Sequence, residues 1–205
     1  MNLNPQHLDS LGLLAPKHKG VFTLSDLSNL FLTKHPVALQ QKLKPFLKAK
    51  ILYRFCRGFY VTKDFSLESL SQKISPRSAI SFGSVLAKEM LIGSIPQKTV
   101  YAVKIGKSRT YSSELGRVVH LGLLPQLFFG YSKWREGVCY ADKEKAFLDL
   151  LYFYQKGRKF SFNIYSDIQT DRLDQKILKK YLGRYKNQKF KKFVEGLLNG
   201  KHKIG

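Results

Sequence analysis

The residues from 21 to 61 constrain the fold of this chain most strongly, because signals for a helix, a turn, a second helix and a hairpin follow one another there. Thr23 and Asp26 have the spacing of a helix N-cap and its reciprocal partner. Pro36 suits the first position of a second helix. Two apolar and aromatic runs then flank the basic turn Cys56-Arg57-Gly58, which predicts a β-hairpin. This is the order of elements in a winged helix-turn-helix.

The second helix of the pair is predicted to separate an apolar face from a basic one. Leu39, Leu43, Phe46 and Leu47 fall on one side. The other side carries glutamine and lysine without a carboxylate, which suits contact with base edges and phosphates in a major groove. The candidate residues are Gln40, Gln41, Lys42, Lys44 and Lys48. We expect Pro45 to kink or end this helix, because it removes the hydrogen bond to the Gln41 carbonyl.

Alternation along the first strand of the hairpin places Arg54 opposite Tyr53 and Phe55. Arg54 and Arg57 are therefore candidates for contact with a minor groove or with phosphates. Ser25, Lys34 and His35 are further candidate phosphate contacts. A plain hairpin and an ordinary solvated helix surface are the alternatives for each part alone. The combination in this order favours DNA binding.

The charge of the chain points to the same class of partner. Lysine and arginine number 36 against 14 aspartate and glutamate residues, a net charge of +22. Such an excess is typical of proteins that bind a polyanion, and nucleic acid is expected before a membrane surface. A generally basic proteome and an effect on solubility are the alternatives. Cys56 and Cys139 form no disulfide framework or metal-ligand pattern, so no metal or cofactor is expected. We expect a cytoplasmic protein without a membrane span.

The predicted fold class is α+β, with a winged helix-turn-helix at residues 1–70 and a mixed domain at residues 71–205. A polar, serine-rich connection is expected at 62–75, with at most one helical turn. A helix is expected to start at Pro76-Arg77-Ser78. Strands are expected at 99–105, 109–112, 116–121, 126–131 and 138–140, in a mainly antiparallel sheet because their connections are short. Helices are expected at 143–154, 172–182 and 189–198. The role of the basic region 156–205 is left open.

One dense polar group allows two interpretations. Asp142, Glu144, Lys145 and Asp149 have the residue types of a metal-dependent nuclease. They also fit a helix start, in which Asp142 is the N-cap, Glu144 favours the helix dipole, and Lys145 pairs with Asp149 at i, i+4. We favour the structural interpretation and expect no enzymatic activity.

Two motifs carry a resemblance to a known family. The hairpin end Arg57-Gly58-Phe59-Tyr60-Val61 resembles the opening of the AbiEi antitoxins of type IV abortive-infection toxin–antitoxin systems. The helix start at Ser78-Ala79, the central strands, and the run from Ala141 to Leu150 with Glu144, Lys145, Ala146, Leu148 and Asp149 resemble the second domain of that family, with Phe147 where leucine is expected. The resemblance covers roughly residues 21 to 154.

The resemblance implies a repressor that binds inverted repeats in double-stranded operator DNA. It also implies a second domain that contacts DNA and counteracts a nucleotidyltransferase-like toxin without a stable complex. The sequence therefore predicts a sequence-specific repressor that is also an antitoxin. A nuclease and a stand-alone regulator without a toxin partner are the alternatives.

Overall fold

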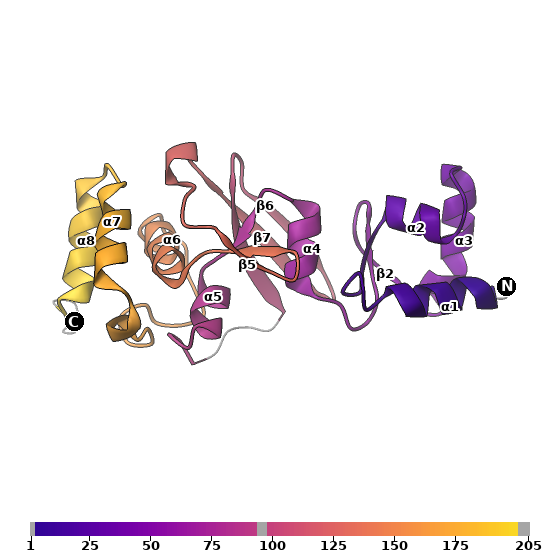
Figure 1. Cartoon of the computed structure of the whole chain (residues 1–205), viewed down its shortest axis with the longest axis horizontal. Helices are drawn as coiled ribbons and strands as arrows, with labels where there is room; N and C mark the ends of the chain where they lie inside the picture. Colours follow the sequence, from indigo (N-terminus) through magenta and orange to yellow (C-terminus); the bar gives the residue numbers. More distant parts are fainter. Residues whose placement is uncertain (1–2, 94–97, 201–205) are drawn as a thin grey trace.

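The computed structural model describes residues 3–93 and 98–200 and shows an elongated α+β protein (Figure 1). The N-terminal helices lie at one end, a mixed sheet lies in the middle, and two C-terminal helices lie at the other end. The expected fold class is confirmed. Within the described residues, no helix has the length and apolar character needed to cross a membrane.

The N-terminal part combines three helices with a three-stranded antiparallel sheet. The helices are α1 (Pro5–Leu14), α2 (Leu24–Leu30) and α3 (Pro36–Lys48), and the strands are β1 (Val21–Thr23), β2 (Tyr53–Cys56) and β3 (Phe59–Val61). β3 lies between the other two strands. The predicted capping box is present at α2, because the Thr23 hydroxyl accepts a hydrogen bond from the Asp26 N–H and the Asp26 carboxylate accepts one from the Thr23 N–H.

The core of this part is built from the helix faces that the apolar spacing predicts. Leu39, Leu43 and Phe46 of α3 are buried against α1, α2 and one face of the sheet, while Leu47 is half-buried. Their partners in the core are Leu11, Phe22, Leu27, Leu30, Phe31, Leu52 and Tyr60. Each fully buried side chain of this size contributes about 1.5–3 kcal/mol of hydrophobic free energy. The buried face of α3 therefore fixes which side of the helix faces solvent.

Of the two outcomes expected at Pro45, a kink or an end of the helix, the end is wrong, because α3 continues to Lys48. Pro45 deprives the Gln41 carbonyl of its intrahelical donor. The carbonyl of Pro45 itself accepts the N–H of Ala49 (2.9 Å), and Phe46 is buried one residue later. Packing after the proline thus keeps the last turn in place, and Lys48 stays on the helix.

The polar connection expected at 62–75 is mostly a helix, α4 (Leu67–Ile74), capped by Ser66. Leu70 and Ser71 are fully buried, and α4 contacts several strands of the second sheet. The expected boundary between residues 70 and 71 therefore falls inside an element that packs on the second domain. The serines of this segment, which are typical of a linker, include a helix cap, Ser66, and a buried residue, Ser71, that is hydrogen-bonded to His120.

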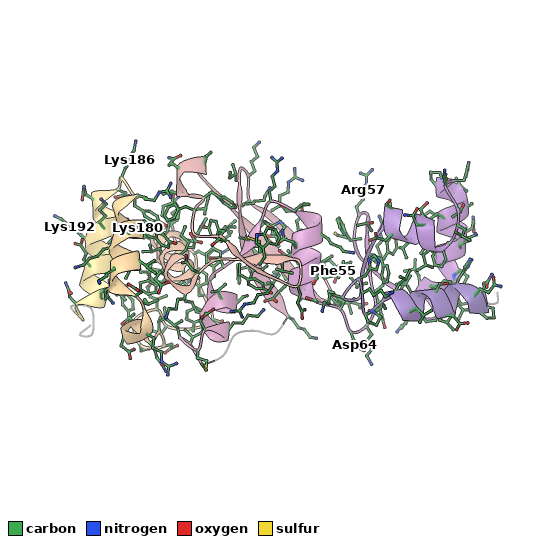
Figure 2. The ribbon with its side chains drawn as sticks, viewed as in Figure 1. Phe55, Arg57, Asp64, Lys180, Lys186 and Lys192 are labelled. Atoms are coloured by element: carbon green, nitrogen blue, oxygen red, sulfur yellow. The ribbon has the colours of Figure 1, made fainter. Side chains whose placement is uncertain are left out.

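The three-stranded sheet is buried on both faces. Its strands alternate, so that Phe22 and Tyr60 join the N-terminal core, while Val21, Phe55 and Val61 join the core of the second domain. Figure 2 shows Phe55 between the two parts of the molecule. The two domains thus share this sheet.

The second domain is built on a six-stranded sheet in the order β6-β7-β5-β4-β9-β8. Its strands are β4 (Ala79–Ile80), β5 (Thr99–Ile105), β6 (Arg109–Ser113), β7 (Gly116–Leu123), β8 (Lys133–Arg135) and β9 (Val138–Tyr140). The pairs β6–β7, β8–β9 and β4–β5 are antiparallel, whereas β5–β7 and β4–β9 are parallel. The sheet is mixed because β7 lies between β5 and β6 and runs in the direction of β5.

Two predicted elements of this domain were wrong. Ala79 and Ile80 form the short strand β4 instead of opening a helix, and helix α5 (Gly83–Lys88) begins only after Phe82, whose φ is 60°. Both β4 residues are fully buried in the middle of the sheet, where an apolar pair has no period that identifies a strand. The strand expected at 126–131 is instead a 3₁₀ turn, Pro125–Leu127, followed by irregular chain, and β8 follows it.

The remaining helices cover the sheet and end the described chain. α6 (Lys143–Gln155) begins at the predicted cap Asp142, and a 3₁₀ turn (Thr170–Arg172) precedes α7 (Gln175–Gly183) and α8 (Gln188–Leu198). The predicted pair of Lys145 and Asp149 is present and is completely buried. α6 is thus an interior helix, with α5, α7 and α8 in contact with it.

Candidate nucleic-acid interface

The exposed side of α3 carries a single stripe of polar side chains. Gln41, Lys44 and Lys48 are exposed and recur at i, i+3 and i+7, opposite the buried Leu39, Leu43 and Phe46. Gln40 is exposed at the edge of the stripe. Neutral amides and cations on one face provide donors and acceptors for base edges together with charge for phosphates.

Three further predicted residues are exposed, two in the turn before α3 and one at the start of α2. Lys34 and His35 are exposed, and His35 occupies the N-cap position without a side-chain capping bond. Ser25 is exposed on the first turn of α2. The N–H of Leu24 donates to the carbonyl of Gly58 (3.2 Å), so the start of α2 is held against the turn of the hairpin. Ser25 and the hairpin turn therefore belong to the same side of the domain.

Lys42 lies apart from the other predicted contacts. It is half-buried, and its Nζ donates to the carbonyl of Phe31 (2.6 Å) at the C-terminal end of α2. An ammonium group at that position satisfies a free carbonyl and interacts favourably with the helix dipole. Burial and the positive charge of Lys42 also lower the pKa of His7 on α1. Lys42 is thus a contact within the protein that fixes α2 against α3.

The hairpin carries its two arginines on the outside. Arg54 and Arg57 are exposed, while Phe55 between them is buried toward the second domain. The turn is made by Arg57 and Gly58, and Gly58 has a φ of 85°, which glycine adopts without steric cost. A bulge between Arg54 and Cys56 shifts the register of the two strands. Figure 2 shows Arg57 projecting from the tip of the hairpin away from the body of the molecule.

The charge around these residues has one sign. Residues 27–63 contain eight lysine and arginine residues and no aspartate or glutamate. The nearest preceding carboxylate, Asp26, is engaged by the Thr23 N–H and by the Nζ of Lys73 (3.2 Å). Burial raises the pKa of Asp26, but the bond from the Thr23 N–H and the charge of Lys73 outweigh it and lower the pKa overall. The exposed residues of α3 and the hairpin therefore carry positive charge and no carboxylate.

Sequence reasoning missed one exposed residue on the stripe. Val37, in the first turn of α3, leaves 61% of its surface exposed. It lies four residues before Gln41, seven before Lys44 and eleven before Lys48, so all four share one face of the helix. The spacing alone would have included it. Its apolar side chain gives no hydrogen-bonding or charge signal for contact with nucleic acid.

The second domain adds a basic groove at the far end of the molecule. The groove has a volume of about 450 Å³ and lies where α6 meets the turn between α7 and α8. Its cations are Lys156, Arg184, Lys186 and Lys189, and its apolar wall includes Tyr152. Lys180, Lys186 and Lys192 project into solvent around this end (Figure 2). The cations of the groove belong to the basic region 156–205, to which the sequence assigns no role.

The dense polar group at the start of α6 is committed to internal contacts. The Asp142 carboxylate accepts hydrogen bonds from the Lys145 N–H (2.8 Å) and from the Tyr181 hydroxyl (2.6 Å). Glu144, which is 2% exposed, accepts the N–H of Asp174 (2.9 Å). Lys145 is fully buried against Asp149, and burial lowers the pKa of its ammonium group although Asp149 opposes the shift. Among residues 3–93 and 98–200, no cluster of three or more potential metal ligands was found.

Comparison with known proteins identifies a fold but no family. No protein-family model matches the chain, and no curated protein sequence matches it. The chain is similar in structure to the RV2827C protein from Mycobacterium tuberculosis, known from its crystal structure, with a TM-score of 0.66. The match covers 98% of this chain and 78% of that chain, at 10% sequence identity. At this identity the likeness concerns the arrangement of the two domains and not their chemistry.

Proposed function

We propose that this protein is a sequence-specific repressor that binds double-stranded DNA in the cytoplasm. The observation that carries the proposal is the exposed stripe of Gln41, Lys44 and Lys48 on α3, next to a hairpin with Arg54 and Arg57 on its outer side. Helix-turn-helix proteins place their second helix in the major groove, with its N-terminal residues at the base edges. The same placement of α3 brings this stripe against the bases.

Each group of residues has a distinct task in this proposal. Gln41 pairs with an adenine edge through its amide, and Lys44 and Lys48 meet guanine or phosphate groups. Arg54 and Arg57 of the hairpin lie along the adjacent backbone or minor groove. Ser25, Lys34 and His35 hold phosphates and set the orientation of the domain. Lys42 contributes indirectly, because it holds α2 against α3.

We further propose that the protein is an antitoxin of the AbiEi kind, which binds inverted repeats upstream of its own gene and counteracts a nucleotidyltransferase-like toxin without a stable complex. The motifs at Arg57-Gly58-Phe59 and Glu144-Lys145-Ala146 support this proposal. The basic groove of the second domain is consistent with a second contact to nucleic acid.

The DNA-binding part is tested by fluorescence anisotropy with a duplex from the region upstream of the gene and a scrambled duplex of equal composition. We expect Gln41→Ala to reduce the ratio of specific to non-specific affinity. The loss should correspond to roughly 1–3 kcal/mol of binding free energy, as for loss of a bidentate base contact. Gln6→Ala, on the exposed side of α1, is the matched control and should leave the ratio unchanged. An unchanged ratio in Gln41→Ala would show that this face of α3 does not read bases.

The antitoxin part is tested by co-expression with a nucleotidyltransferase encoded beside the gene. Restored growth of toxin-expressing cells, without co-purification of the two proteins, is the expected result. Repression of the upstream promoter without restored growth would instead identify a stand-alone regulator.

A further inference from the structure

The exposed side of α3 begins with an apolar residue, and Leu32 in the turn before the helix is also exposed. Val37 is 61% exposed in the first turn, whereas the other apolar residues of α3 at positions 39, 43 and 46 are buried. Val37 shares its face with Gln41, Lys44 and Lys48. It is thus the N-terminal member of the stripe.

This position matters because of how a recognition helix enters DNA. The N-terminal residues of such a helix lie closest to the base edges. The major groove presents one apolar group, the C5-methyl of thymine, and apolar side chains recognise thymine by contact with it. A β-branched side chain has a restricted χ1, so its two methyl groups are held in place before binding.

From this placement, and on the basis of the function proposed above, we infer that Val37 packs against a thymine methyl group in the operator and is a specificity-determining residue. Gln41 follows four residues later, about 6 Å along the helix axis. This rise corresponds to roughly two base-pair steps of about 3.4 Å. The thymine that contacts Val37 therefore lies within about two base-pair steps of the adenine that Gln41 reads.

The surroundings of Val37 favour DNA over a second copy of the protein as the occupant of this face. Lys34 and His35 precede Val37 and are exposed, and residues 27–63 contain no carboxylate. A second copy placed face to face would bring like charges together, which is unfavourable. A polyanion that carries methyl groups in its groove satisfies both the basic stripe and its apolar end.

The experiment uses the full chain and a duplex chosen by selection from a random library. Each thymine of the selected duplex is replaced in turn by deoxyuridine, which removes only the C5-methyl group. We expect one replacement to weaken binding of the wild type about three- to fivefold, in line with the burial of one methyl group. Binding of Val37→Ala should be weakened by a similar factor on the unmodified duplex and should not respond to that replacement.

A control and a structural check accompany this comparison. Leu13→Ala removes an apolar side chain that is 74% exposed on α1 and should respond to deoxyuridine as the wild type does. Single adenines of the duplex are also replaced by 7-deazaadenine, and one replacement should weaken binding by the wild type but not by Gln41→Ala. That adenine should lie within about two base-pair steps of the thymine that Val37 contacts. Thermal unfolding of Val37→Ala should match the wild type, because the side chain is exposed.

The possible failures are distinguishable. If selection enriches no sequence, the proposed function fails together with the inference. If a sequence is enriched and bound specifically, but every deoxyuridine replacement is silent, or Val37→Ala responds to them as the wild type does, only the inference is overturned. It is also overturned if sedimentation shows a wild-type dimer that Val37→Ala dissociates, since Val37 would then contact a second copy.

Discussion

At the scale of single residues, lysines that look equivalent in the sequence have different surroundings in the structure. Lys42 and Lys44 are two positions apart on α3. Lys44 is exposed on the stripe, whereas the Nζ of Lys42 is held by the Phe31 carbonyl. A sequence shows the period of the helix but not the free carbonyl at the end of its neighbour. The distinction between an exposed lysine and a lysine bound within the protein therefore required the structure.

Mutation of Lys42 should mainly affect stability, whereas mutation of Lys44 should mainly affect DNA binding. We expect Lys42→Met to lower the free energy of unfolding by about 1–2 kcal/mol, because the bond from a charged donor is lost. Its effect on DNA affinity should be smaller than that of Lys44→Met, which should weaken binding while leaving stability within about 0.5 kcal/mol of the wild type. Denaturant titration and anisotropy on both variants check this. If Lys42→Met and Lys44→Met weakened DNA binding equally, Lys42 would have to break its bond to the Phe31 carbonyl and contact DNA.

Glu144 is a second residue whose task is more specific than its sequence position indicates. Sequence reasoning assigned it to the helix dipole, but it is almost fully buried and accepts the N–H of Asp174, the N-cap of α7. Glu144→Ala should lower the free energy of unfolding by about 1–3 kcal/mol, because the Asp174 N–H loses its bond to a charged acceptor. Glu144→Gln keeps an acceptor and should cost less.

The same variants address the nuclease interpretation. Incubation of wild type with plasmid or RNA and Mg²⁺ or Mn²⁺ should give no cleavage. Cleavage that disappears in Glu144→Gln, with stability retained, would make Glu144 a catalytic group and contradict the assignment of this residue to helix packing.

At the scale of elements, sequence reasoning succeeded where caps and periods were clear and failed where burial was complete. The capping box at Thr23, the helix start at Pro36, strand β5 and the cap at Asp142 were all predicted. The serines and glutamine of α4 are typical of a polar linker, but Ser71 and Gln72 are buried. The two buried apolar residues of β4 are too few to show the alternation that distinguishes a strand from a helix.

A buried histidine at the contact between α4 and β7 should make the stability of the protein depend on pH. His120 of β7 is fully buried and hydrogen-bonds to Ser71 of α4 (2.8 Å). Burial lowers the pKa of His120 to about 4, Lys104 adds to the shift, and the bond to Ser71 opposes it. An unfolded histidine has a pKa of about 6.5. The folded state therefore resists protonation that the unfolded state accepts as the pH falls from about 6.5 toward 4.

The free energy of unfolding should not depend on His120 above about pH 6.5. Below that pH it should decrease, and protonation of His120 alone should lower it by about 2 kcal/mol at about pH 5. His120→Gln should lose most of that dependence, and the exposed His35→Gln should retain it. Urea titrations at three pH values test this. An identical acid-side loss in wild type and His120→Gln would assign the effect to other groups.

Because the two domains share the three-stranded sheet, we expect the stability of the N-terminal domain to depend on the second domain. Residues 1–65 alone would expose Val21, Phe55 and Val61, which the second domain covers in the full chain. We expect Phe55→Ala to cost about 3–5 kcal/mol in the full chain, as for other buried phenylalanines. In a fragment of residues 1–65 the same substitution should cost far less. Equal costs in chain and fragment, measured by thermal unfolding, would show that the winged domain does not depend on the second one.

At the scale of the whole molecule, charge and shape act together. The net charge of +22 is distributed over an elongated body with α3 and the hairpin toward one end and the basic groove at the other. The composition predicts a polyanionic partner, but not that the exposed basic residues gather both on the α3 surface and in a distant groove. That division follows from the fold, which places the mixed sheet between them.

The central claim is that α3 reads base sequence in double-stranded DNA while the surrounding cations bind phosphates. The most direct measurement is the affinity of the full chain for its upstream duplex and for a scrambled duplex across a salt series. If six or more phosphates are neutralised, affinity should fall about a thousandfold or more between about 50 and 200 mM salt. The preference for the upstream duplex should persist throughout and should decrease in Gln41→Ala. A flat salt dependence, or equal affinity for both duplexes at every salt concentration, would contradict the account.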